Sequence, residues 1–146
     1  RTDVLLTALT AKRRRNPLLE LGKTHAMTHR VTPETTAIAL KSGSLAVLAT
    51  PVMIAWMEEC CLECVQPALE PGFTTVGTQV NVTHEAPTPV GNEVTVRCRL
   101  EAVESRCLTF SVEASDSAGF IGRGSHQRFI VDGARFQAKC DRKRDQ

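Results

Sequence analysis

The chain of 146 residues has very few aromatic side chains: no tyrosine, one tryptophan and five phenylalanines. It therefore offers no aromatic platform on which the bases of a single-stranded nucleic acid would stack. It also lacks a run of about 18 apolar residues, which a transmembrane helix needs. The most apolar stretch, residues 45–55, is too short to cross a bilayer. We expect no nucleic-acid partner and no membrane partner.

Several common catalytic motifs are also absent. There is no Gly-rich phosphate loop, no G-x-S-x-G nucleophile turn and no H-E-x-x-H zinc motif. Of the six cysteines, Cys60, Cys61 and Cys64 are clustered and the others are scattered, which is neither a disulfide framework nor a zinc spacing. We expect free thiols, no metal and no cofactor. Free thiols favour a cytoplasmic protein, although the Arg-rich beginning leaves an organelle as the alternative.

The composition is that of one ordinary globular domain, with 42% apolar and 23% charged residues. The net charge of +2 is unevenly spread, because both ends are basic and residues 24–138 carry a net charge of −4. We divide the chain into a basic N-terminal lead-in (1–22), a folded domain (23–138) and a basic C-terminal tail (139–146). Solvated tails are the simplest reading of the two ends, and attraction to anionic partners is the alternative.

The clearest element is a helix over residues 51–66. Thr50 is a good N-cap, proline is favoured in the first turn, and Pro67 ends the pattern. Apolar side chains cover most of its circumference, with one polar strip formed by Glu59, Glu63 and Gln66. A helix this apolar needs cover on most sides.

Alternating patterns predict strands over residues 74–84, 93–104, 107–115 and 119–131. Residues 24–31 look strand-like but alternate poorly. The short links in the second half make those strands antiparallel neighbours. The fold class is therefore α+β, an antiparallel sheet of about five strands wrapped around one long apolar helix. The open edges of such a sheet favour a homodimer or a dimer of dimers.

Three polar residues stand out by their positions. Thr50 lies at the positive end of the helix dipole, where an oxyanion would be stabilised, or it is a plain cap. Glu58 lies about 80° around the helix from Thr50 and roughly 12 Å along its axis. It is either a functional carboxylate in apolar surroundings or a glutamate that reaches water. His84, at the end of a strand, is either a general base or an ordinary surface histidine.

A second group lies on the last strand. His126 and Arg128 alternate with Gly122 and Gly124, and such glycines allow a ligand or another backbone to approach closely. The arginine would hold a phosphate or carboxylate, or form an ion pair. We interpret His25 and His29 as structural or exposed.

At these residues the chain resembles the hotdog-fold thioesterases related to fluoroacetyl-CoA thioesterase. The resemblance is carried by ATPVMIAWMEECC, TTVGTQVNVTHEAPTPVG and IGRGSHQRFIV, in this order, and runs from about Leu45 to Val131. It implies the hotdog fold, a dimer and an acyl-CoA substrate. It also implies catalytic roles for Thr50, Glu58 and His84, and substrate contacts by Gly77 and Arg128.

The chain departs from the fluoroacetyl-specific enzymes in the segment before the helix. That segment, residues 41–49, has no aromatic residue, and Ser44 stands where the resemblance implies a gating phenylalanine. We therefore expect hydrolysis of a short or medium acyl-CoA to a carboxylate and free CoA. The alternatives are a non-catalytic acyl-CoA or acyl-carrier binding module and a hotdog acyl-CoA hydratase. Val47, Leu48, Met53 and Val76 are the residues expected to line the acyl pocket.

Overall fold

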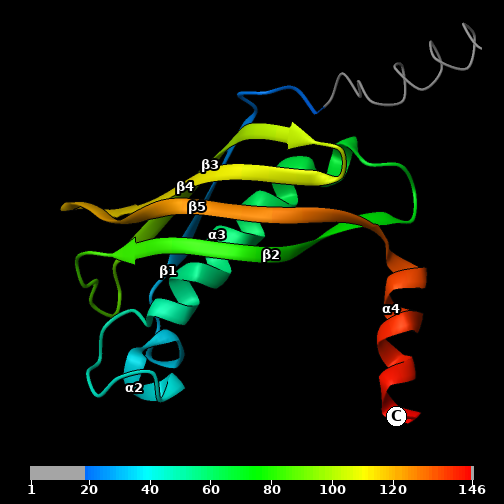
Figure 1. Cartoon of the computed structure of the whole chain (residues 1–146). Coiled ribbons are helices and arrows are strands. Elements are labelled where there is room, and N and C mark those ends of the chain that lie inside the picture. The colour runs from blue at the N-terminus through cyan, green and yellow to red at the C-terminus, as the bar shows by residue number, and fades with distance from the viewer. Residues whose placement is uncertain (1–18, 146) are drawn as a thin grey trace, which may run out of the picture.

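The structure is a computed structural model and describes residues 19–145. Figure 1 shows a curved sheet with one long helix against its inner face. The strands are β1 (Thr24–Arg30), β2 (Phe73–His84), β3 (Glu93–Glu104), β4 (Cys107–Asp116) and β5 (Gly119–Asp132). The helices are α2 (Ala37–Leu40), α3 (Thr50–Val65) and α4 (Gly133–Asp141), with 3-10 turns at Pro33–Thr35, Gln66–Ala68 and Arg142–Asp145.

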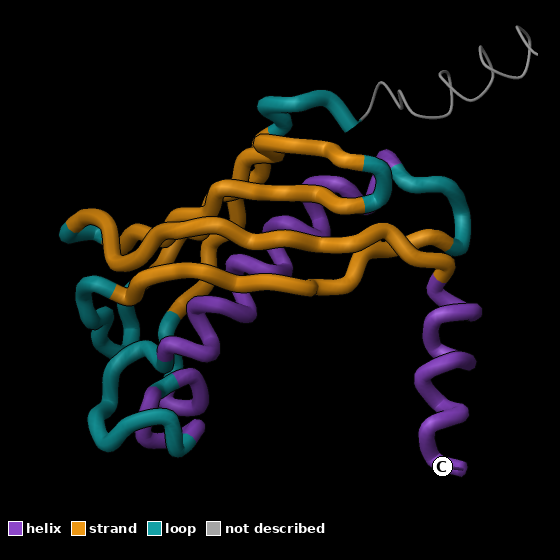
Figure 2. Tube along the Cα trace, viewed as in Figure 1, coloured by secondary structure: helices purple, strands orange, loops and turns teal. Residues whose placement is uncertain are grey.

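All five strands form one antiparallel sheet in the order β1-β3-β4-β5-β2. The expected α+β arrangement, a five-stranded sheet around one helix, is therefore confirmed, and Figure 2 shows α3 running diagonally across the sheet. β1 and β2 are the two edges. β2 is the longer of them and has no charged residue and no proline, the features by which edge strands usually avoid pairing with other chains.

The core lies between α3 and the inner face of the sheet. Its fully buried side chains include Met53, Met57, Cys60, Val94, Val96, Leu100, Leu108, Phe110 and Ile121. The helix begins one residue earlier than expected, because Ala49 occupies the N-cap and Thr50 is already helical. The prediction that Thr50 caps the helix is therefore wrong, and its hydroxyl is free for a different partner.

A β-bulge divides β2 into two parts. Gly77 pairs with Arg128 and Gln79 pairs with Gln127, so Thr78 is an extra residue in the ladder. Residues directly opposite each other share a face of the sheet. Beyond the bulge Val80, Val82 and His84 face α3, as expected.

Before the bulge, each residue of β2 faces the side of the sheet opposite to the one that uninterrupted alternation would predict. Gly77, opposite the buried Arg128, faces α3, whereas Val76 lies opposite the exposed Phe129 on the outer face. The predicted common face of Val76, Val80 and Val82 is wrong for Val76, because the extra residue inverts the alternation.

After β5 the chain continues into α4, which Figure 1 shows standing away from the sheet. Asp132 caps this helix by accepting a hydrogen bond from the Arg135 backbone N–H. The boundary expected between the folded domain and the C-terminal tail, at residue 139, falls inside α4. Most of the N-terminal lead-in lies outside the described residues. The division of the chain into these three parts therefore stays a prediction. Within residues 19–145, no helix is both long and apolar enough to cross a membrane.

Candidate active site

The first part of the site joins the start of α3 to the end of β2. The Thr50 hydroxyl and His84 Nδ1 are 2.7 Å apart, a short hydrogen bond. The other ring nitrogen of His84, Nε2, is buried and has no hydrogen-bond partner among the described residues. Burial lowers the pKa of His84, so the ring is neutral at pH 7. A neutral imidazole with one uncommitted nitrogen is able to accept a proton.

The second part of the site lies in the middle of α3. The Glu58 carboxylate is 3.6 Å from the guanidinium of Arg128, which is 6% exposed. It also lies over Gly77, because a Cβ atom built on that glycine would be 2.7 Å from Glu58 Oε2. The absence of a side chain at Gly77 therefore makes room for the carboxylate. Burial lowers the pKa of Arg128, whereas the negative charge of Glu58 raises it, so Glu58 stabilises the charged form of the buried guanidinium.

These two parts are separate within one chain. Thr50 and Glu58 are eight residues apart on one helix, about 12 Å along its axis. No hydrogen bond or ion pair among the described residues joins Glu58 to Thr50 or His84. The structure thus brings together Thr50 with His84, and Glu58 with Gly77 and Arg128, but not all five residues.

A buried histidine that the site prediction omitted lies beside Glu58. His126 is 1% exposed, and its Nε2 atom is 3.1 Å from Arg128 and 4.0 Å from Glu58. The alternation with Arg128 was visible in the sequence. The contact to Glu58 was not, because it depends on how β5 packs against α3.

The glycines of β5 serve the protein rather than a ligand. A Cβ atom on Gly122 would collide with the Thr83 carbonyl and with Met53, and one on Gly124 would collide with the backbone of Asn81. Of the two alternatives, close approach of another backbone is therefore the one that the structure shows.

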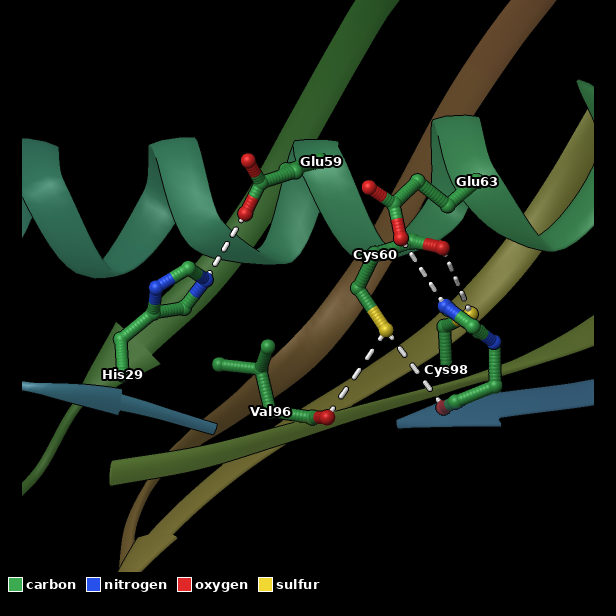
Figure 3. Close-up of polar contacts among 7 residues, drawn as sticks. His29, Glu59, Cys60, Glu63, Val96 and Cys98 are labelled. Carbon is green, nitrogen blue, oxygen red and sulfur yellow. Dashed lines mark hydrogen bonds and ion pairs between the residues drawn. The ribbon is translucent and has the colours of Figure 1, made fainter. Parts of the chain in front are cut away.

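The opposite side of α3 carries a different set of carboxylates. Glu59 lies 2.7 Å from His29, and Glu63 lies 3.2 Å from His25, so both glutamates face β1 (Figure 3). The His29 ring also stacks on Trp56, with ring centroids 4.8 Å apart. The interpretation of His25 and His29 as structural residues agrees with these pairs.

A small cavity adjoins the Thr50–His84 pair. Its volume is about 240 Å³, and its lining contains no Phe, Tyr or Trp: Ala37, Ser42, Val47, Leu48, Thr50, His84, Glu85, Ala86 and Pro87. Val47 and Leu48 are expected lining residues, but Met53 is buried in the core and Val76 lies on the outer face. Ser44 belongs to an exposed segment, residues 41–46.

The cysteines lie apart from these groups. All six are free, and four of them, Cys60, Cys61, Cys64 and Cys98, are buried between α3 and the sheet. The Cys60 thiol donates to the carbonyl of His25, and Figure 3 shows that it also donates to the carbonyl of Val96. Within residues 19–145, no group of three or more His, Cys, Asp and Glu side chains is arranged to hold a metal ion.

Comparisons with known proteins agree with this geometry. Residues 31–134 match the family model described as fluoroacetyl-CoA-specific thioesterase. The curated fluoroacetyl-CoA thioesterase of Streptantibioticus cattleyicolor is 42% identical over 97 residues, which are 66% of this chain and 70% of that protein.

Solved structures show the same likeness. A structure of the fluoroacetyl-CoA thioesterase FlK superposes with a TM-score of 0.82 at 35% identity, covering 85% of this chain and 96% of FlK. A hypothetical protein of Thermus thermophilus, described as a thioesterase superfamily member, has a TM-score of 0.80 at 29% identity and covers 87% of this chain and 94% of its own. The hotdog fold is thereby confirmed, and the chain belongs to the fluoroacetyl-CoA-specific thioesterase family.

Proposed function

We propose that the protein is an acyl-CoA thioesterase that hydrolyses a short or medium acyl-CoA to a carboxylate and free CoA. The observation that carries the proposal is the Glu58 carboxylate, held over the bare backbone of Gly77 beside a buried arginine. An oxygen nucleophile adds to the thioester carbonyl, the carbon–sulfur bond breaks, and the CoA sulfur leaves with a proton. The reaction consumes one water and needs no redox partner.

Each site residue has a role that its position supports. Glu58 acts at the carbonyl carbon, either as the nucleophile or as the base that activates water. His84, neutral and with Nε2 uncommitted, accepts a proton from water and passes it to the leaving sulfur. Thr50 orients His84, Gly77 leaves room for the Glu58 carboxylate, and Arg128 holds that carboxylate in place. A single turnover in H₂¹⁸O tests the nucleophilic role, because label found in Glu58 requires that its carboxylate formed a covalent intermediate.

A homodimer would unite the two separate parts of the site. Residues 77–81 of β2 are exposed at an uncharged sheet edge, which suits antiparallel pairing with a second β2. Such pairing moves the His84 end of each strand toward the first half of its partner, where Gly77 lies. The site would then combine Glu58 and Gly77 of one protomer with Thr50 and His84 of the other.

Mixed dimers test this arrangement. Glu58→Gln and His84→Gln are each inactive as homodimers, but a hybrid of the two has one intact site if the site is shared between protomers. We expect activity to return on mixing and refolding the two variants. A hybrid that stays inactive would place all the residues in one protomer.

Light scattering gives the assembly directly. We expect twice the protomer mass of 15.9 kDa, or four times that mass for a dimer of dimers. Val80→Lys, at the β2 edge, should yield an inactive monomer, whereas Val90→Lys, at a similarly exposed valine outside β2, should not. A stable and active monomer of the parent protein would refute the dimer.

The substrate range follows from the cavity beside His84. It is small, is lined by both aliphatic and polar side chains, and has no Phe, Tyr or Trp as a gate, so we propose that pocket size decides the acyl group. A single methylene changes binding in an apolar pocket by only about 1–3 kcal/mol. We therefore expect fluoroacetyl-CoA to exceed acetyl-CoA in kcat/KM by less than roughly 100-fold.

The experiment measures CoA release from acetyl-, fluoroacetyl-, butyryl-, hexanoyl- and aryl-CoA with a thiol reagent. Because Cys140 is exposed, an enzyme-only blank is subtracted. A fluoroacetyl preference of several orders of magnitude would show that another part of the chain supplies the gate. Tight binding without CoA release would indicate a binding module instead.

The four buried free thiols support a reducing compartment, and we keep the cytoplasm as the proposed location.

A further inference from the structure

His126 is a buried polar residue to which the proposed reaction gives no role. It lies on the face of β5 toward α3 and is 1% exposed. Burying an imidazole is costly unless both ring nitrogens find partners. The partners of His126 therefore show what the side chain does.

The two partners fix the tautomer of the ring. Nδ1 lies 2.8 Å from the carbonyl oxygen of Gln79, which only accepts hydrogen bonds, so Nδ1 carries the proton. Nε2 lies 3.1 Å from the guanidinium of Arg128, which only donates, so Nε2 must be unprotonated. Burial lowers the pKa of His126, in agreement with a neutral ring. The Gln79 carbonyl follows the extra residue Thr78, so the bulge of β2 supplies the group that sets the tautomer.

Arg128 is held on both sides of its guanidinium. Nε donates to the Thr75 hydroxyl at 2.7 Å, and one terminal nitrogen donates to the Thr75 carbonyl at 2.9 Å. The other terminal nitrogen donates to His126 and is also 3.6 Å from the Glu58 carboxylate. Thr75 thus fixes one edge of the plane, and His126 fixes the corner that faces Glu58.

We propose that His126 is a positioning residue: as the neutral Nδ1–H tautomer it holds the Arg128 guanidinium in the orientation that keeps the Glu58 carboxylate over Gly77. This inference rests on the proposed function of Glu58. Both nitrogens of His126 are occupied, so it transfers no proton in the reaction. Its effect is exerted through Arg128, and a loss of His126 should misplace the carboxylate without removing it.

Two substitutions of His126 distinguish the contributions of its two ring nitrogens. His126→Gln keeps an oxygen near the position of Nε2 that accepts from Arg128, whereas His126→Asn keeps only a donor near the position of Nδ1. We expect His126→Asn to lower kcat by about 10–100-fold with little change in KM, since a misplaced catalytic group costs this much. His126→Gln should restore most of kcat. The matched control is His29→Gln, another histidine that faces α3 but pairs with Glu59, and it should leave kcat unchanged.

A double substitution tests the route through Arg128. If His126 acts only by placing the guanidinium, His126→Asn should add no further loss to Arg128→Lys. Losses that multiply, or equal kcat values for the Asn and Gln variants, would overturn the proposal.

A spectrum of the parent protein provides a test that needs no turnover. Long-range ¹H–¹⁵N correlations should show His126 as the neutral Nδ1–H tautomer, and the Nε2–H tautomer or an imidazolium would overturn the inference. This measurement also decides the case if His126→Asn fails to fold. It further distinguishes the two proposals, because an absence of CoA release by the parent protein would refute the thioesterase but not the tautomer.

Discussion

Three glutamates on α3 illustrate how the surroundings of one side-chain type decide its use. Glu59 and Glu63 face the edge strand β1, where each carboxylate lies within hydrogen-bond distance of a histidine. Glu58, adjacent to Glu59 in the sequence, faces β2 and β5, where it meets a glycine and a buried arginine. The three side chains are similarly exposed, at 40%, 43% and 50% for Glu58, Glu59 and Glu63, so the difference lies in their partners. Glu59 and Glu63 are each within hydrogen-bond distance of a histidine, whereas Glu58 lies over a glycine at 3.6 Å from an arginine.

The largest difference in activity between the two sides of α3 is expected when each of the two neighbouring glutamates is replaced by glutamine. Glu58→Gln should lower kcat by about 10²–10⁴-fold, the usual cost of losing a general base or nucleophile. Glu59→Gln should change kcat little and should weaken only the contact to His29, a partly exposed pair worth about 0.2–1 kcal/mol. Steady-state kinetics with thermal melting checks both variants. Equal losses in two folded variants would remove the distinction between the two sides of α3.

A smaller change sharpens the same comparison by filling the space over Gly77. Gly77→Ala places a methyl group where the Glu58 carboxylate lies. Because the carboxylate is at the end of a flexible side chain, it should move aside with little loss of stability, and kcat should fall by about 10²-fold. Thr78→Ala, at the next residue, is the control. Full activity in Gly77→Ala would mean that the space over Gly77 is not needed.

The histidines of the β2 side should make stability depend on pH. Burial lowers the pKa of both His84 and His126, whereas in the unfolded chain these groups titrate near the ordinary value of 6.5. Below pH 6.5 the unfolded state therefore binds more protons than the folded state, and the free energy of unfolding falls as the pH falls.

Urea unfolding between pH 7.5 and 5 measures this slope. His126→Gln removes one of the two groups and should flatten the dependence. If the variant and the parent protein show the same slope, His126 does not contribute to it.

The smallest effect on activity is expected from alkylating the cysteines. Hydrogen bonding with Cys98, together with burial, raises the pKa of the Cys60 thiol, and burial raises that of Cys64. Iodoacetamide should therefore modify the exposed Cys140 first, with no loss of activity. Mass spectrometry identifies the modified residue. Rapid labelling of Cys60 in the native protein would contradict the packing of α3.

The helix and the strands were predictable because their signals are local. Proline, glycine and the change of hydrophobic period set the bounds of α3 and of the strands to within a residue or two. The phase of α3 also predicted that Glu58 and Glu59 lie on different sides. α4 was missed, since its nine residues carry a single capping signal, Asp132, and no apolar face against the body.

What the sequence pattern missed depends on contacts between distant segments. Thr78 looks like any other residue of an alternating strand, and only its pairing with β5 shows that it is inserted. The alternation placed His126 on one face with Arg128, but its role was not predictable, because that role also requires the bulge of β2. The resemblance supplied Gly77 and Arg128 as site residues, and the structure adds the space at the one and the hydrogen bonds at the other.

The bulge of β2 makes the strand sensitive to its length rather than to the identity of one residue. Substitutions at the exposed Thr78 leave the number of residues in the strand unchanged and should be tolerated. Deleting Thr78 would restore a regular ladder in which Gly77 still lies opposite Arg128 and still faces α3, but it would remove the bend beside Gln79, whose carbonyl holds the His126 ring. Within this family, we therefore expect sequence drift at this position but no loss of the residue itself.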